Sequence, residues 1–375
     1  MSTSTTQYPS YQSLTLLSRL LILGRDQGRD QLAPNPANRS SLKPDVLTLT
    51  RAQFEDLLAL AQLNHVVMRG LDVFRALALE ENDAMRAEWA GQALAQEGLR
   101  IETAALYLAA ICQAFSEQKY GVAVIKSLDH WPDLGSDLDL YCDASPEEVC
   151  ALMKRRFNAE IEPRSWGDRL ACKWNFKVPG LPESIEIHVG RLGQTGEQVE
   201  IASSVLKRAR QVRIGERTFR VPSVTERLLI STLQRMYRHF YFRLCDIVDS
   251  ARLAESGQID YADFRAAAQK AGIWKGTATY MQIVSDYMKN YRGRGLELPQ
   301  FVTAAARFGA AETYYARGFI RVPIMPQSAR LYTSQLAGVL GKGSLHNGAR
   351  LSLLPWLATA AAVGQKLTGS DKGIW

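Results

Sequence analysis

The stretch of residues 121–143, GVAVIKSLDHWPDLGSDLDLYCD, constrains the fold of this chain more than any other part. It contains two short apolar runs with strand character, residues 122–125 and 138–141, and a loop with Pro and Gly separates them. Side chains alternate across a strand, so Asp137 and Asp139 are expected to project from one face while their apolar neighbours pack on the other. Adjacent carboxylates repel each other unless a cation lies between them, which makes the pair a candidate Mg²⁺ site. A solvent-exposed Asp-x-Asp at a strand end has the same pattern, so the assignment depends on the downstream sequence.

Length and composition set the broad class of the protein. A chain of 375 residues can bury a substantial core and form two or three packed units, and 46% hydrophobic with 22% charged residues is ordinary for a soluble protein. The net charge of +7 weakly favours polyanionic partners, either nucleotides or nucleic acid. The five cysteines have no C-x-x-C spacing and are expected to be buried free thiols. We find no signal-peptide pattern and no uncharged apolar run of about 18 residues, so we expect a cytoplasmic protein without stable membrane insertion.

A second strand pattern supplies another acidic residue. Residues 184–189 alternate between apolar and polar side chains, which places Glu186 and His188 on one face. The preceding run, residues 170–178, also has strand character, and the Pro- and Gly-containing turn between the two runs predicts an antiparallel pair. A hydrogen bond from His188 could orient the Glu186 carboxylate.

Helical patterns surround these strands. An apolar patch predicts a short helix in the first segment, and a packed core role is expected for His65. A capping box at residues 223–226 opens a long amphipathic helix. With its continuation, this helix presents Arg235, Arg238, His239 and Arg243, either as one wall of a cleft or as solvated helix charges. The other predicted elements are helices over 14–23, 50–63, 66–79, 84–94, 101–118, 145–156, 198–210, 244–256, 261–271 and 277–291, and a hairpin of 211–214 with 218–221.

The order of these elements resembles the DNA polymerase beta-like nucleotidyltransferase superfamily. In its pattern a strand is followed by a Gly/Ser turn, about ten residues, Asp-x-Asp, and an acid on a later strand; here nine residues separate Ser127 from Asp137. The closer likeness is to a bacterial, largely uncharacterised branch, which residues 135–140 (GSDLDL), 186–188 (EIH) and 243–247 (RLCDI) resemble. The resemblance spans about residues 101–264.

This resemblance implies an α+β fold, with a small mixed β-sheet core flanked by helices and helical N- and C-terminal regions. It implies Mg²⁺, with two ions possible, and an NTP such as ATP as the donor of a nucleoside monophosphate to an unidentified hydroxyl or amine. Asp137, Asp139 and Glu186 would be the catalytic and metal-binding residues. Residues expected to contact the nucleotide or support the site are Lys126, Ser127, Ser136, His188, Arg238, His239 and Arg243. The expected division is an N-terminal arm (1–45), an N-terminal helical region (46–100), the nucleotidyltransferase core (101–222), a helical domain (223–295) and a C-terminal helical extension and tail (296–375).

Two departures from the family pattern leave alternatives open. Lys126 replaces the first-turn glycine that lets the backbone approach phosphates, and the distal acid is Glu186 rather than Asp. A catalytically inactive nucleotide- or RNA-binding protein is therefore the alternative, and a run of basic residues supports it. That run consists of Lys207, Arg208, Arg210, Arg213, Arg217 and Arg220. The sequence does not choose among a small molecule, a protein and an RNA end as the acceptor. It does not determine the base preference or the oligomeric state either.

Overall fold

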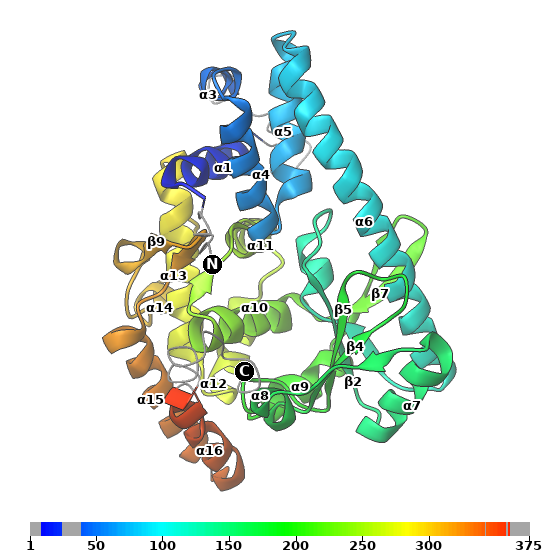
Figure 1. Cartoon of the computed structure of the whole chain (residues 1–375). Helices are drawn as coiled ribbons and strands as arrows, with labels where there is room; N and C mark the ends of the chain where they lie inside the picture. The colour runs from blue at the N-terminus through cyan, green and yellow to red at the C-terminus, as the bar shows by residue number, and fades with distance from the viewer. Residues whose placement is uncertain (1–8, 25–38, 342, 358, 361–375) are drawn as a thin grey trace, which may run out of the picture.

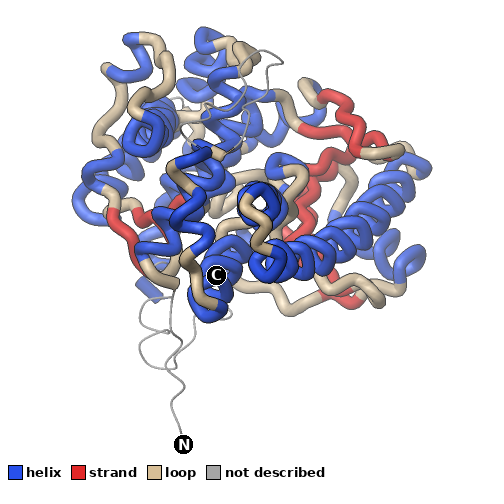
Figure 2. Tube along the Cα trace, turned by 90° about the horizontal axis from the view of Figure 1, so that it is seen from above, coloured by secondary structure: helices blue, strands red, loops and turns tan. Residues whose placement is uncertain are grey.

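A computed structural model describes residues 9–24, 39–341, 343–357 and 359–360 of the chain. The fold is α+β, as predicted. A five-stranded mixed sheet lies on one side of the molecule, and helices surround it (Figure 1). Seen from above, the strands form two separated groups among the helices (Figure 2).

The five-stranded sheet has the order β1-β2-β5-β4-β3, and its two central strands carry the predicted acidic residues. β2 and β5 are parallel, and in their register Asp139 lies opposite Glu186. The other neighbouring pairs are antiparallel, which confirms the predicted pairing of β4 with β5. The strands are β1 (Val122–Val124), β2 (Asp137–Cys142), β3 (Glu160–Ile161), β4 (Lys173–Lys177) and β5 (Ser184–Val189). β4 is shorter than predicted because a Ser165 capping box starts helix α8 (Trp166–Leu170) just before it.

One hydrophobic core lies between this sheet, the long helix α6 (Ala84–Glu117), helix α7 (Pro146–Phe157) and the hairpin of β6 (Arg210–Ile214) with β7 (Arg217–Val221). The predicted hairpin and the predicted capping box of α7 are both present. α6 is a single helix where two were predicted. Its polar middle continues as helix, where Arg100 pairs with Glu97 one turn earlier.

A second and larger core is helical. α1 (Tyr11–Leu23), the short helix predicted in the first segment, is largely buried in this core. The helix predicted from the capping box at residue 223 changes to a π-helix after Thr232 and ends at Arg238. The elements here are α3 (Lys43–Leu47), α4 (Arg51–Leu63), α5 (Val67–Glu80), α9 (Val199–Lys207), α10 (Val224–Thr232), π-helix η2 (Leu233–Arg238), α11 (Leu244–Glu255), α12 (Tyr261–Lys270) and α13 (Trp274–Arg292).

The C-terminal part adds short elements and a three-stranded sheet of order β8-β10-β9. No helix among the described residues is both long and apolar enough to cross a bilayer. All five cysteines are free, and Cys142 and Cys245 are fully buried. The elements are β8 (Tyr241–Phe242), α14 (Gln300–Thr303), η3 (Ala310–Glu312), β9 (Tyr314–Ala316), β10 (Phe319–Arg321), η4 (Ile324–Ser328), α15 (Ala329–Leu340) and α16 (Leu345–Ser352).

Candidate active site

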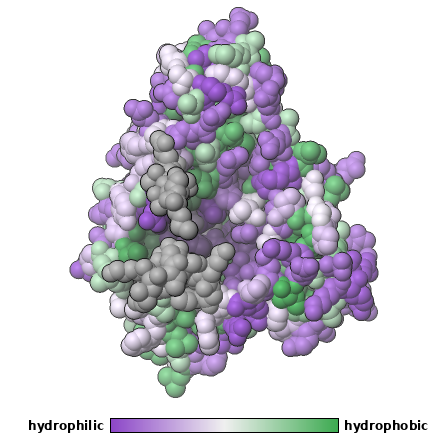
Figure 3. Space-filling view, viewed as in Figure 1, coloured by the Kyte–Doolittle hydropathy of each residue, from purple (hydrophilic) through white to green (hydrophobic). Residues whose placement is uncertain are grey.

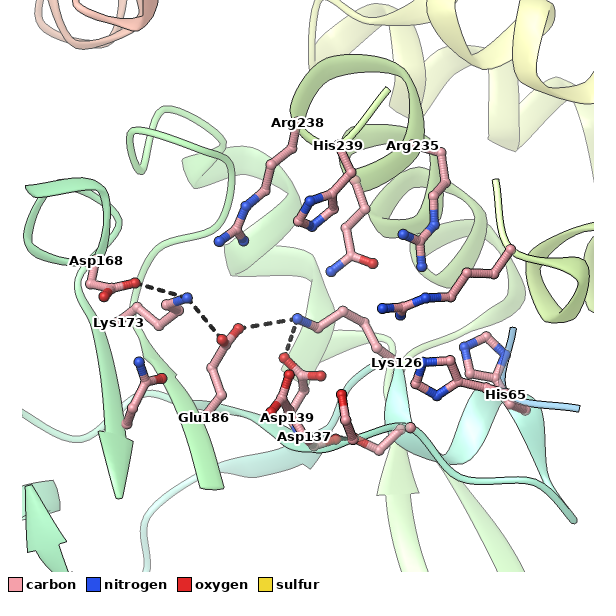
Figure 4. A pocket seen from close by; sticks show the side chains of 17 residues that line it. His65, Lys126, Asp137, Asp139, Asp168, Lys173, Glu186, Arg235, Arg238 and His239 are labelled. Atoms are coloured by element: carbon pink, nitrogen blue, oxygen red, sulfur yellow. Dashed lines mark hydrogen bonds and ion pairs between the residues drawn. The ribbon is translucent and has the colours of Figure 1, made fainter. Parts of the chain in front are cut away.

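The turn after β1 brings Lys126 into a cleft beside the sheet (Figure 4). Lys126 has φ 63° and ψ −58°, and the Ser127 amide donates a hydrogen bond of 2.6 Å to the Ile125 carbonyl. This is a γ-turn with a positive central φ, a rare and strained conformation. Glycine adopts positive φ without penalty, so this is a backbone position that favours glycine, although a lysine occupies it.

Ser127 fixes this turn against strand β2. Its hydroxyl accepts a hydrogen bond of 2.7 Å from the Asp139 amide and donates one of 3.3 Å to the Asp137 carbonyl. The residue is only 2% exposed. The Ser127 hydroxyl therefore serves the backbone of β2, whereas the predicted role was a contact to phosphate. Ser136 is exposed and does line the cleft.

Four ion pairs join alternating acidic and basic side chains along one wall of the cleft (Figure 4). The Lys126 ammonium pairs with Asp139 Oδ1, and it lies 3.2 Å from Glu186 Oε1. On the other side of Glu186, Lys173 Nζ lies 2.8 Å from Oε2 and 2.8 Å from Asp168 Oδ1. Asp139 and Glu186, two of the three carboxylates expected to bind a metal ion, thus share one ammonium group.

His188 lies behind this row of charges. Its Nε2 is 2.8 Å from Glu186 Oε1, so the predicted orienting hydrogen bond is present. Burial lowers the pKa of His188 to about 4, which keeps the imidazole neutral near pH 7. A neutral ring can donate this hydrogen bond from Nε2 without adding a charge to the site. His188 does not line the main cleft; it lines a smaller cavity next to it.

The carboxylates differ in their affinity for protons. Burial favours the protonated form of Glu186, but Lys126, His188 and Lys173 hold its pKa well below its usual value. Burial raises the pKa of Asp139 well above its usual range, against the opposing charge of Lys126. Burial, and then the charge of Glu186, raises the pKa of Asp137. Glu186 therefore keeps its negative charge, and Asp139 is the first of this buried pair to bind a proton.

The opposite wall of the cleft is basic and comes from the π-helix η2 and the loop after it (Figure 4). Arg238 and Arg243 line the cleft as predicted, and Arg243 is also the N-cap residue of α11. Arg235 is buried, with Nε 2.7 Å from Asp246 Oδ2, so part of its charge is neutralised within the protein. Burial and the neighbouring arginines hold the pKa of His239 well below its usual value, which leaves a neutral imidazole in the cleft. The cleft encloses about 310 Å³ between the acidic and basic walls.

The positions of the candidate metal-ligand atoms show whether Mg²⁺ fits the acidic wall of the cleft. One donor atom from each of Asp139, Glu186 and His188 lies within 4.8 Å of the others. Carboxylate oxygens suit Mg²⁺, and Asp137 on the same strand offers a further, more exposed carboxylate. The residues fit the ion provided that the Lys126 ammonium leaves the space between Asp139 and Glu186.

Several lining residues did not emerge from the sequence. Lys173, Asp168 and Asn175 come from β4 and the helix before it. A lysine inside an alternating strand was the available signal for Lys173, because a lysine is rarely buried without a partner. His65 is buried, as predicted for a core residue, yet its ring lines the cleft together with His130.

A wider groove continues from the cleft and shares its lining at Gly135, Ser136, His65 and Arg243. The groove has a volume of about 930 Å³, and more of its surface is apolar than polar. Its apolar residues include Leu58, Leu63, Val67, Leu134 and Phe319. The space-filling view shows a hollow between the sheet side and the helical side of the molecule, and the surface visible inside it is largely hydrophilic (Figure 3).

No protein-family model matches the chain, and no curated protein matches it in sequence.

Proposed function

We propose that this protein is a Mg²⁺-dependent nucleotidyltransferase that moves a nucleoside monophosphate from an NTP to a hydroxyl or amine acceptor and releases pyrophosphate. One observation carries the proposal: Asp137, Asp139 and Glu186 lie on two adjacent parallel strands, and arginines face them across a cleft. Acidic groups for a divalent cation and basic groups for phosphates are the two requirements of phosphoryl-transfer chemistry.

In this proposal Asp137, Asp139 and Glu186 would hold Mg²⁺, which supplies activation of the attacking oxygen and neutralisation of the triphosphate charge. Glu186, whose pKa is held low, would act as a charged ligand. A proton acceptor works best with a pKa nearer to neutral, so the more exposed Asp137, with its raised pKa, is the better candidate to accept the acceptor's proton.

The basic residues would bind the triphosphate. Arg238 and Arg243 lie on the wall opposite the carboxylates and offer guanidinium donors, which match phosphate oxygens. Lys126 would then exchange its two carboxylate partners for phosphate oxygens, and this would restore the phosphate contact that the family makes at its first turn.

The acceptor would enter through the 930 Å³ groove that joins the cleft at Gly135 and Ser136. Two of its acidic residues, Glu97 and Glu183, are already paired with Arg100. A groove with neutralised charges and a largely apolar lining favours an acceptor with an apolar body over an RNA end, which needs many cations.

Calorimetric titration of each NTP, with Mg²⁺ and with chelator, tests the proposal. Wild type is expected to bind at least one NTP only in the presence of Mg²⁺, and Asp137→Asn/Asp139→Asn is expected to lose that binding. Glu160→Gln, which removes an exposed acid on β3 of the same sheet, should bind like wild type. Absence of NTP binding by wild type, or unchanged binding by the double variant, would refute the assignment.

A specific observation favours a second candidate, a nucleotide-binding protein without catalytic activity. Lys126 already bridges Asp139 and Glu186, so it neutralises the carboxylates without any metal ion. NTP binding that is equal with Mg²⁺ and with chelator would favour this function. Two arginines of the basic run expected to bind RNA already form ion pairs within the chain. Arg208 pairs with Asp263, and Arg217 pairs with Glu102.

A further inference from the structure

A second cavity lies behind the turn that carries Lys126. It has a volume of about 260 Å³ and lies between the turn η1 (Ser127–His130), the β6–β7 hairpin and helix α11. Within η1, Ser127 and His130 line the main cleft, whereas Leu128 and Asp129 line this second cavity. One four-residue turn is therefore a wall of both spaces.

The charges around the second cavity favour an anion. Arg210, Arg227 and Arg252 reach it from three different elements. The two acids in the lining already have partners: Asp129 Oδ1 lies 2.7 Å from Arg227 Nε, and Asp249 pairs with a buried arginine outside this lining, Arg69.

Arg210 has no ion-pair partner among the described residues. Its guanidinium donates to Gln258 Oε1 at 3.2 Å, and its Nε is buried without a hydrogen-bond partner among the described residues. Burial, and then the charge of Arg227, lowers the pKa of Arg210. Two neighbouring guanidinium groups in a partly buried space are stabilised when an anion binds between them.

Apart from Ser256 and Gln258, the remaining lining is apolar, and it includes an aromatic ring. Strand β6 turns Arg210, Val212 and Ile214 toward the cavity, in agreement with the two-residue alternation of a strand. Trp131 and Val221 also line the cavity, so a flat apolar group has contact surface beside the cations.

We infer that this cavity is a second binding site, for one small organic phosphate that carries a planar ring, of the size of a nucleoside monophosphate. A phosphate monoester presents several acceptor oxygens and two negative charges, which suit guanidinium groups that converge from separate elements. The cavity volume of about 260 Å³ is close to the lower end of the range for ligand pockets, which is about 300 Å³. The cavity therefore accommodates one small molecule rather than a polymer. The bound phosphate would lie next to η1, the turn that holds Ser127 and follows Lys126.

Calorimetry with AMP, GMP, CMP, UMP and inorganic phosphate, on the full chain in the presence of chelator, tests this site. At least one nucleoside monophosphate is expected to bind wild type with a stoichiometry of one. Arg210→Ala and Arg252→Ala should each weaken this binding at least tenfold. Arg213→Ala is the matched control, because Arg213 is exposed on the same strand and is absent from the cavity lining.

Three results would overturn the inference. The first is that none of the four nucleotides binds wild type, and the second is that Arg210→Ala and Arg252→Ala bind as tightly as Arg213→Ala. The third is that Arg238→Ala, a change in the main cleft, weakens binding as much as Arg210→Ala does, which would place the ligand in that cleft. Binding of inorganic phosphate as tight as that of the nucleotides would overturn the assignment of a ring-bearing ligand. Thermal unfolding of each variant separates loss of the site from loss of the fold.

Discussion

Replacement of Lys126 by Met tests whether the Lys126 ammonium occupies the position where Mg²⁺ would bind. The substitution keeps a side chain of similar length but leaves Asp139 and Glu186 buried without their shared partner. The Lys126 side chain is 13% exposed, so solvent screens the ion pairs little. Removal of one partner from a buried ion pair costs about 3–5 kcal/mol. An unfolding entropy of about 2.1 cal/mol/K per residue gives about 0.8 kcal/mol per degree for this chain, so the Tm in chelator should fall by about 4–6 °C.

Mg²⁺ is expected to reverse this loss. A ligand that binds only the folded state at a thousand times its Kd contributes about 4 kcal/mol, close to the cost of the substitution. In wild type the ion has to displace the ammonium first, so Mg²⁺ should raise the Tm of Lys126→Met more than that of wild type. Thermal unfolding followed by circular dichroism, at constant ionic strength and increasing Mg²⁺, measures both effects.

Two control variants complete this experiment. Lys154→Met removes an exposed lysine on α7 and should melt like wild type under both conditions. In Lys126→Met/Asp139→Asn the Mg²⁺ response should disappear, because one of the ligands is lost. If Lys126→Met melts like wild type in chelator, the ion pairs do not contribute as argued. If Mg²⁺ shifts wild type and variant equally, Lys126 and the metal ion do not compete.

Three further predictions follow from the same region. Lys126→Gly should be more stable than Lys126→Met by about 1–2 kcal/mol in urea unfolding, because glycine relieves the positive φ. Arg69→Met should cost about 3–5 kcal/mol in the same assay, because Arg69 is the buried partner of Asp249 and of a second buried acid. Burial opposes protonation of His130, but a neighbouring thiol and Asp249 raise its pKa well above the usual value. Its contribution to stability should therefore be complete below about pH 6.5 and fall as pH rises through the folded-state pKa, and His130→Gln should lack this slope in urea unfolding at a series of pH values.

The sequence predicted the elements whose patterns are local. β5 begins and ends where the alternation of residues 184–189 begins and ends, and the hairpin and the capped helix α7 lie where turn and cap residues predicted them. Asp139 and Glu186, which the alternation placed on strands, lie opposite each other on neighbouring strands. Such predictions succeed because alternation and capping depend on residues only a few positions apart.

The predictions failed where packing overrides the local pattern. The polar stretch in the middle of α6 breaks the apolar periodicity, yet the helix continues, because α5 packs along α6 and Arg100 pairs with Glu97. The amphipathic pattern after residue 223 predicted a regular helix, and it gave no indication of the π-helical turns that bring Arg235 and Arg238 to the cleft. Single π-helical turns are frequent at functional sites, but their hydrogen bonds are set by tertiary contacts.

At Lys126, an unusual residue for its backbone conformation is explained by contacts with residues distant in the sequence. In sequence it is a departure from the family pattern that the chain resembles, because a lysine stands at the position of the first-turn glycine. The structure gives Lys126 a positive φ despite the strain, and it places the ammonium between Asp139 and Glu186, which come from two other strands. Strained non-glycine residues persist only where surrounding interactions hold them, and here two ion pairs do so. Under the proposed function, a metal ion has to displace this ammonium, so the choice between the catalytic and the non-catalytic function depends on the relative affinity of these carboxylates for Lys126 and for Mg²⁺.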